Sequence, residues 1–179
     1  MEQPRYLFKI VAVGSGSVGK TSLIRRYCES KFEPKYLPTL GIDFTNKDIT
    51  VKDVKVRILC ADTAGQEYFS KLRPIYYKGA YGALIVFDIL KIRTFEAIDR
   101  WLEELKSSVP ENIPKILVGN KLDLEEERKV TKAQAEQLAA EKNLMYFEAS
   151  AKNGKNVDRI FYELTKTILK NQKERERKD

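Results

Sequence analysis

A glycine-rich run, Gly14 to Thr21, has the spacing of a phosphate-binding loop. It reads Gly-Ser-Gly-Ser-Val-Gly-Lys-Thr, and it lies between a stretch typical of a strand and a stretch typical of a helix. Glycines let backbone N–H groups close around phosphate oxygens, and a helix N-terminus adds its positive field. In such a loop Lys20 reaches the terminal phosphates and the Thr21 hydroxyl binds Mg²⁺. A glycine-rich turn without a ligand is the weaker interpretation in this context. The residues that we expect to contact the nucleotide here are Ser15, Gly16, Ser17, Val18, Gly19, Lys20, Thr21 and Ser22.

A second motif, Asp62-Thr-Ala-Gly-Gln-Glu, follows a β-rich stretch. An acid at a strand end beside a phosphate loop is suited to the water shell of Mg²⁺, so we expect Asp62 to serve the metal. The chain contains no histidine, which leaves the Gln66 amide as the group expected to orient an attacking water. The Gly65 N–H can approach the γ-phosphate. Taken alone, Asp62 and Gln66 would be ordinary turn residues.

The third motif, Asn120-Lys121-Leu122-Asp123, follows a buried-type stretch. Ligands bind at this carboxyl end of the strands in doubly wound sheets. A carboxylate only accepts hydrogen bonds, so Asp123 can satisfy the N1–H and the exocyclic amine of guanine together. Adenine has a lone pair at N1, and a mismatch of this kind can discriminate by roughly 10⁴-fold. The motif therefore predicts guanine, although such residues are also common in simple turns.

The elements that must position these motifs alternate along the chain. Strands are expected over residues 6–13, 43–51, 55–62, 82–88, 115–120 and 145–148. The second and third are separated by only three residues, which include Lys52 and Asp53, and must form an antiparallel hairpin, whereas the later strands alternate with helices and must be parallel. We therefore predict an α/β, P-loop NTPase fold: a six-stranded, mostly parallel sheet with one antiparallel edge strand and five flanking helices.

Apolar spacing locates the main helices. A helix over residues 94–108 buries Trp101 in the core, because the apolar residues recur on one helical face. Thr131 and Gln134 fit a capping box for the next helix. The last helix begins near Val157, and we expect it to fray beyond Leu169, where its apolar residues end.

Composition supports one domain. The chain has 179 residues, 42% hydrophobic and 33% charged, which suits a single soluble core. We divide it into a domain over 1–170 and a charged helix end or tail over 171–179.

The net charge of +7 is spread along the chain, so we interpret it as a charged, solvated surface rather than a nucleic-acid site. Two cysteines without close spacing indicate neither a disulfide framework nor zinc.

Five motifs in order resemble those of the small GTPases of the Ras superfamily, from about Leu7 to Leu169. The resemblance implies a G domain that binds GTP or GDP with Mg²⁺ and hydrolyses GTP. It also implies roles outside the three motifs above. Thr39 would bind Mg²⁺ and the γ-phosphate, and Phe32 would pack against the base. Tyr36 would fold over the phosphates. The sequence Glu-Ala-Ser150-Ala151-Lys152 would form a second guanine loop.

Within the superfamily the details resemble Rab proteins, which implies a switch in vesicle or membrane trafficking. Residues 40–44 resemble the Rab first switch, and residues 76–80 resemble its second-switch helix. Phe44 and Tyr76 match two residues of the Rab aromatic triad, but Ala61 stands where the third, a tryptophan, is usual. No particular effector can therefore be carried over.

The resemblance implies effector, exchange-factor and activating partners that bind around Thr39 and Gln66. We expect a monomeric, cytoplasmic protein, peripheral to a membrane at most through partners or a missing tail. The chain as given has no lipid anchor, because residues 170–179 hold no cysteine, so either the chain is truncated or the protein works without a lipid. No arginine occurs over residues 31–38, so this segment cannot supply an arginine finger in cis and unaided hydrolysis should be slow.

Three alternative functions stay open: a nucleotide-gated binding module with negligible hydrolysis, a binder of nucleic acid or anionic lipid, and a P-loop ATPase or kinase.

Overall fold

The computed structural model describes residues 3–34, 38–65 and 70–178. Six strands form one sheet in the order β2-β3-β1-β4-β5-β6. Their bounds are β1 Tyr6–Val13, β2 Ile42–Val51, β3 Val54–Thr63, β4 Gly82–Asp88, β5 Lys115–Asn120 and β6 Met145–Ala149. Only the edge pair of β2 with β3 is antiparallel, and the other four pairs are parallel. The predicted sheet, including its antiparallel edge strand, is confirmed.

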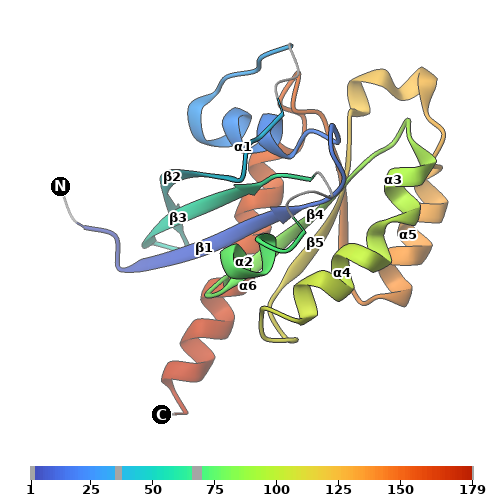
Figure 1. The fold of residues 1–179 in the computed structure, drawn as a ribbon. Helices are drawn as coiled ribbons and strands as arrows, with labels where there is room; N and C mark the ends of the chain where they lie inside the picture. The colour runs from blue at the N-terminus through green and yellow to red at the C-terminus, as the bar shows by residue number, and fades with distance from the viewer. Residues whose placement is uncertain (1–2, 35–37, 66–69, 179) are drawn as a thin grey trace.

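Helices cover both faces of this sheet (Figure 1). They are α1 Lys20–Glu29, α2 Arg73–Tyr77, α3 Ile92–Glu96, α4 Ile98–Lys106, α5 Lys132–Glu141 and α6 Val157–Glu176, with a 3₁₀ helix, η2, over Leu122–Glu127. Apolar residues of α1 and α6 pack in one buried cluster, whereas those of α2, α4 and α5 pack in another. The sheet lies between these clusters, as expected for strands connected by helical crossovers.

The one helix expected over residues 94–108 is two helices in the structure. Ala97 lies between α3 and α4, so six α-helices occur in the described ranges where five were expected. α3 also begins before Thr94. The Thr94 hydroxyl forms hydrogen bonds with backbone groups that precede the helix. It accepts a hydrogen bond from the Asp88 N–H (3.0 Å) and donates to the Lys91 carbonyl (2.7 Å). Trp101 is buried, as predicted, with 1% of its surface exposed.

The C-terminal helix is longer than expected. We predicted fraying beyond Leu169, but α6 continues to Glu176. Polar contacts replace the missing apolar ones, since the Tyr6 hydroxyl donates to Glu176 (2.9 Å) and Gln172 donates to the same side chain (3.1 Å). α6 crosses the proposed boundary after residue 170 without a break. At the other predicted helix start, Thr131 and Gln134 form the capping box.

None of the helices in the described ranges has the length and apolar character needed to cross a membrane. The carboxyl ends of the parallel strands are the expected place for a ligand, since β1 is flanked there by β3 on one side and β4 on the other. Loops that leave neighbouring strands in opposite directions open a crevice at such a point.

Candidate nucleotide-binding site

A cavity of about 840 Å³ opens at this edge of the sheet. It collects residues from every predicted motif that the structure describes. The predicted residues that line it are Gly16, Ser17, Gly19, Lys20, Thr21, Ser22, Phe32, Thr39, Asp62, Gly65, Asn120, Lys121, Asp123, Ala151 and Lys152. Segments distant in the sequence thus meet in one hollow whose volume suits a nucleotide.

The loop between β1 and α1 has a backbone that binds anions well. Ser17 and Gly19 both have positive φ angles, of 64° and 97°, a geometry that turns successive N–H groups to one side. Gly19 is also required by space, because an added Cβ would lie 2.2 Å from Nδ2 of Asn120. Gly14 is likewise confined, with the carbonyl oxygen of Val86 only 2.2 Å from such a Cβ.

Lys20 is buried at the base of this loop. Its ammonium donates to the carbonyls of Gly14 (2.7 Å) and Ser15 (3.0 Å). Burial lowers the pKa of Lys20 to about 8, and the negative charge of Asp62 opposes that shift. A buried ammonium that donates to neutral carbonyls retains a strong attraction for an anion, as phosphate binding requires.

Three oxygen-bearing side chains converge beside Lys20. The Thr21 and Thr39 hydroxyls lie 2.9 Å apart, and both donate to Oδ2 of Asp62, at 2.5 and 3.2 Å. The other oxygen of Asp62, Oδ1, is buried and has no hydrogen-bond partner among the described residues. Burial raises the pKa of Asp62, while the Thr21 hydrogen bond opposes this.

This arrangement fits Mg²⁺. All three groups offer hard oxygen atoms, and a buried carboxylate oxygen without a partner is suited to a metal or its water shell. The described ranges contain no cluster of three or more His, Cys, Asp or Glu side chains. A metal held here would therefore share its coordination with hydroxyls, water and phosphate, which is the usual pattern for Mg²⁺.

Gly65 brings the loop after β3 against the phosphate loop. A Cβ added to Gly65 would lie 2.5 Å from both the Gly14 carbonyl oxygen and the Lys20 ammonium. Its N–H group can approach a terminal phosphate because no side chain intervenes. Gln66 and Tyr36, two of the predicted contacts, lie outside the described residues.

Asn120 connects the phosphate loop to the segments that carry Asp123 and Ala151, which we call the base-side loops. Its amide donates to the Val18 carbonyl (2.9 Å) and accepts from the Ala151 N–H (3.2 Å). Val18 is fully buried and contributes this backbone carbonyl instead of lining the cavity. Neighbouring Lys121, the N-cap of η2, forms an ion pair with the buried carboxylate of Asp88 (2.6 Å), which fixes the start of the segment that carries Asp123.

The carboxylate of Asp123 faces the second base-side loop. The Ser150 hydroxyl donates to its Oδ1 (2.6 Å), and the Lys152 ammonium lies 4.0 Å from its Oδ2. Ser150 is fully buried and does not line the cavity, so it positions Asp123. Phe32 approaches from the loop after α1, where the Arg26 guanidinium lies 5.9 Å from its ring centre. Ser15, like Ser150, is absent from the cavity lining.

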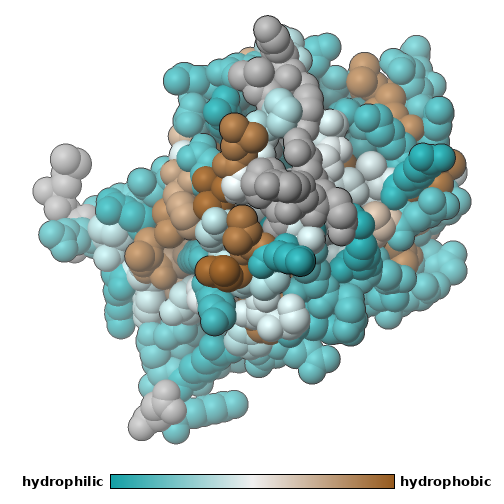
Figure 2. Space-filling view, viewed as in Figure 1, coloured by the Kyte–Doolittle hydropathy of each residue, from teal (hydrophilic) through white to brown (hydrophobic). Residues whose placement is uncertain are grey.

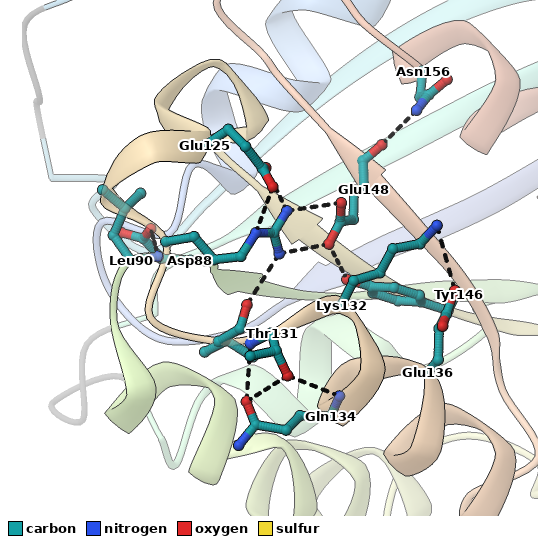
Figure 3. A network of polar contacts seen from close by, with 12 residues as sticks. Asp88, Leu90, Glu125, Thr131, Lys132, Gln134, Glu136, Tyr146, Glu148 and Asn156 are labelled. Carbon is teal, nitrogen blue, oxygen red and sulfur yellow. Dashed lines mark hydrogen bonds and ion pairs between the residues drawn. The ribbon is translucent and has the colours of Figure 1, made fainter.

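Arg128, which was not predicted from the sequence, links the elements that carry the two base-side loops. Its guanidinium donates to Glu125 of η2 (2.9 Å) and to Glu148 of β6 (2.8 Å). Tyr146 donates to the same Glu148 carboxylate (2.7 Å). Figure 3 also shows the Asn156 amide, at the N-cap of α6, donating to the backbone carbonyl of Glu148 (2.7 Å). The charge pair of Glu125 and Arg128 on one turn was the available signal, but its link to Glu148 depends on the tertiary fold.

Arg73 is a second missed residue, and it supports the loop after β3. It is almost fully buried in α2, donates to the Ala64 carbonyl (3.3 Å) and forms a two-point ion pair with Glu104 of α4 (2.7 Å). Its guanidinium also lies 4.7 Å from the centre of the Trp101 ring. No sequence pattern distinguishes this arginine from the many exposed ones.

The cavity is also lined by residues that the sequence did not predict. They are Arg25, Glu33, Pro34, Pro38, Leu40, Ile42, Asp43, Thr63 and Leu124.

Comparisons with known proteins agree with this geometry. The model of the Ras family matches residues 9–170. Rab-13 from Bos taurus is 41% identical over 164 residues, covering 92% of this chain and 81% of that protein. SEC4 from Candida albicans is 41% identical over 162 residues, covering 90% and 77%, and Rab-21 from Canis lupus familiaris is 40% identical, covering 92% and 74%. The chain therefore belongs to the Ras family, as a Rab-like small GTPase that binds GTP and GDP with Mg²⁺, hydrolyses GTP and acts as a switch in vesicle trafficking.

Proposed function

We propose that the cavity at the carboxyl edge of the sheet holds GTP, with the phosphates at Lys20 and the base at Asp123. The observation that carries this proposal is the convergence on one cavity of a buried ammonium, the oxygen cluster of Thr21, Thr39 and Asp62, and the carboxylate of Asp123. Each of these groups suits a different part of a magnesium-bound guanine nucleotide.

On the phosphate side, the roles follow from charge and hydrogen-bonding capacity. Lys20 and the N–H groups from Ser15 to Ser22 hold the β- and γ-phosphates and offset charge that develops as the terminal phosphoryl group leaves. Thr21, Thr39 and Asp62 hold Mg²⁺, which when bound neutralises phosphate charge. We assign to Gln66 the orientation of the attacking water, in line with the bond that breaks, and to Gly65 an N–H contact with the γ-phosphate.

On the base side, Asp123 accepts the N1–H and the exocyclic amine of guanine. The Ala151 N–H meets the base carbonyl, and Lys121, Lys152 and Phe32 flank the ring. Ser150 supports this assignment because its hydroxyl holds one oxygen of Asp123.

An exchange of specificity tests the base assignment. In Asp123→Asn the new amide N–H can donate to the 2-carbonyl of xanthine but opposes the amine of guanine. We expect the variant to prefer XDP over GDP, whereas the wild type prefers GDP by orders of magnitude. Competition between the two nucleotides measures this, and an unchanged preference for GDP would refute the role of Asp123.

The same contacts provide a switch. Thr39 and Gly65 contact the γ-phosphate from two separate loops, so its loss on hydrolysis releases both loops and changes the surface that partners meet. Support comes from the exposed apolar side chains around these loops, since Leu40 is 82% exposed and Ile75 is 61% exposed. Figure 2 shows hydrophobic residues gathered on this face of the molecule. We propose that effectors, exchange factors and activators bind here.

We also propose that the chain acts as a monomer in the cytoplasm and meets membranes through partner proteins. This proposal is supported by the chain's own residues, which supply both the phosphate side and the base side of the cavity. The substitution noted at Ala61 changes the partner-facing surface indirectly, because Ala61 is buried and pairs across the hairpin with the half-exposed Phe44.

A further inference from the structure

The only two cysteines of the chain lie in contact, although they are far apart in the sequence. Cys28 is near the C-terminal end of α1, and Cys60 is on β3. Their sulfur atoms are 3.9 Å apart, and both are free thiols. Cys60 is fully buried, whereas Cys28 is partly exposed. One thiol of the pair is therefore open to a small reagent while the other is shielded behind it.

The surroundings of Cys28 favour its reaction. Lys47, on β2, donates from its ammonium to the carbonyl of Tyr27 (2.5 Å), next to Cys28 in the chain. The hydrogen bond with Cys60 and the positive charge of Lys47 lower the pKa of the Cys28 thiol against the effect of burial. A partly exposed thiol beside a cation and next to a second thiol is the arrangement found in peroxide-sensitive pairs.

We propose that Cys28 and Cys60 form a reversible intramolecular disulfide when a hydroperoxide oxidises the protein. The Cys28 sulfur attacks the peroxide O–O bond, which gives a sulfenic acid and one molecule of water when the oxidant is hydrogen peroxide. The Cys60 sulfur then attacks the Cys28 sulfur, the S–O bond breaks, and a second water leaves. Two thiols are thereby oxidised and one hydroperoxide is reduced. A dithiol reductant reverses the bond by exchange.

The bond would restrain the nucleotide site, an effect that rests on the proposed function. It would join the end of α1, just before Phe32, to β3 just before Asp62. The two cysteines are 32 residues apart, and the chain between them carries Phe32 and Thr39. A cross-link that closes this segment removes open states in which α1 and β3 separate. We therefore expect the oxidised protein to release GDP more slowly than the reduced protein.

Mass spectrometry tests the bond itself. Folded protein is treated with hydrogen peroxide, alkylated in denaturant and digested without reductant. We expect a cross-linked peptide pair lighter by two hydrogens than the sum of its thiol forms, lost after treatment with dithiothreitol. The Cys28→Ser variant should give no such pair. The proposal fails if both thiols of the wild type are still alkylated, if Cys28 is oxidised only to a sulfinic acid, or if the disulfide joins two chains.

Release of a fluorescent GDP analogue tests the effect on the site. We expect release from the oxidised wild type to slow by about threefold or more and to recover with dithiothreitol, with no change in treated Cys28→Ser. Equal rates in cross-linked and reduced protein would refute the restraint. Failure to bind any guanine nucleotide would instead refute the proposed function, and the mass measurement would still decide whether the disulfide forms.

Discussion

At the level of single residues, we propose that the groups that bind the nucleotide are distinct from the group that orients water. Lys20, Thr21 and Asp62 make contacts with each other or with the phosphate loop that hold them in place. A preorganised set of this kind lowers the cost of binding, because little ordering is left to occur. We propose that the rate enhancement of hydrolysis depends on Gln66, since the chain has no histidine to position water.

The Gln66→Leu substitution tests this assignment. Leucine keeps the approximate size of the side chain but removes the amide, so an attacking water loses its partner. We expect single-turnover GTP hydrolysis to fall by about tenfold or more from an unaided wild-type rate of about 10⁻⁴ s⁻¹. GTP affinity should stay nearly the same. Equal rates in the two proteins would refute the catalytic role, and hydrolysis too slow to detect in both would favour a nucleotide-gated binding module.

Residue types and spacing predict which residues reach the cavity better than they predict which residues support it. The Gly14 to Thr21 run and the Asn120 to Asp123 run are local, and each lies in or beside the cavity. Arg128 and Arg73 act through contacts with Glu148 and Glu104, which come from other elements. A local pattern cannot reveal them, because their role is created only when η2 meets β6 and α2 meets α4.

At the level of elements, Arg128 links η2 to β6 and thereby fixes the two base-side loops relative to each other. In Arg128→Gln, Glu148 loses its cationic partner and the loops lose their brace. We expect GDP release to accelerate by about tenfold, which corresponds to about 1.4 kcal/mol. Stopped-flow fluorescence of a labelled GDP measures the rate.

Arg57→Gln provides the matched control for this prediction. Arg57 also donates two hydrogen bonds to one carboxylate, that of Asp48, but the pair is exposed in the β2–β3 hairpin. An exposed pair contributes little, so release should stay at the wild-type rate. Acceleration of the same size in both variants would show that Arg128 has no specific role at the base.

The contact between α2 and α4 predicts a pH-dependent contribution to stability. Burial acts to raise the pKa of Glu104, but hydrogen bonds from Arg73 and Tyr77 outweigh it and hold this pKa below its usual value of 4.5. A depressed folded-state pKa means that the contribution is present at neutral pH and is lost as the pH falls through the folded-state value. Glu104→Gln should therefore lower the free energy of unfolding by about 1–3 kcal/mol at pH 7, because Arg73 is left buried without its carboxylate.

Urea unfolding at pH 7 and near pH 3 measures this, with the nucleotide content of the samples matched. The difference between Glu104→Gln and the wild type should shrink as the pH falls through the depressed folded-state pKa of Glu104, because the wild-type side chain then becomes protonated. Glu103→Gln is the control, since Glu103 forms an exposed pair with Lys106 and should change stability by less than about 0.5 kcal/mol. A difference that does not vary with pH would contradict the role of the ion pair.

At the level of the whole molecule, the alternation of strands and helices predicted the sheet because each apolar stretch was short and bounded by turns. The expected strands at 6–13, 82–88 and 115–120 have the bounds found in the structure. Helix ends were less predictable. The start of α3 at Ile92 and the extension of α6 to Glu176 involve the hydrogen bonds of Thr94 and the contact with Tyr6. Both contacts join parts of the chain that apolar periodicity does not connect.

We propose that one cavity recognises guanine and binds the phosphate chain together with Mg²⁺. Calorimetric titration of nucleotide-free protein in magnesium buffer, with GDP and with ADP, tests it most directly. The structure predicts tight binding of GDP and a far weaker signal with ADP, because Asp123 can accept two hydrogen bonds from guanine and none at adenine N1. Equal affinity for the two nucleotides, or no binding of GDP, would contradict the account.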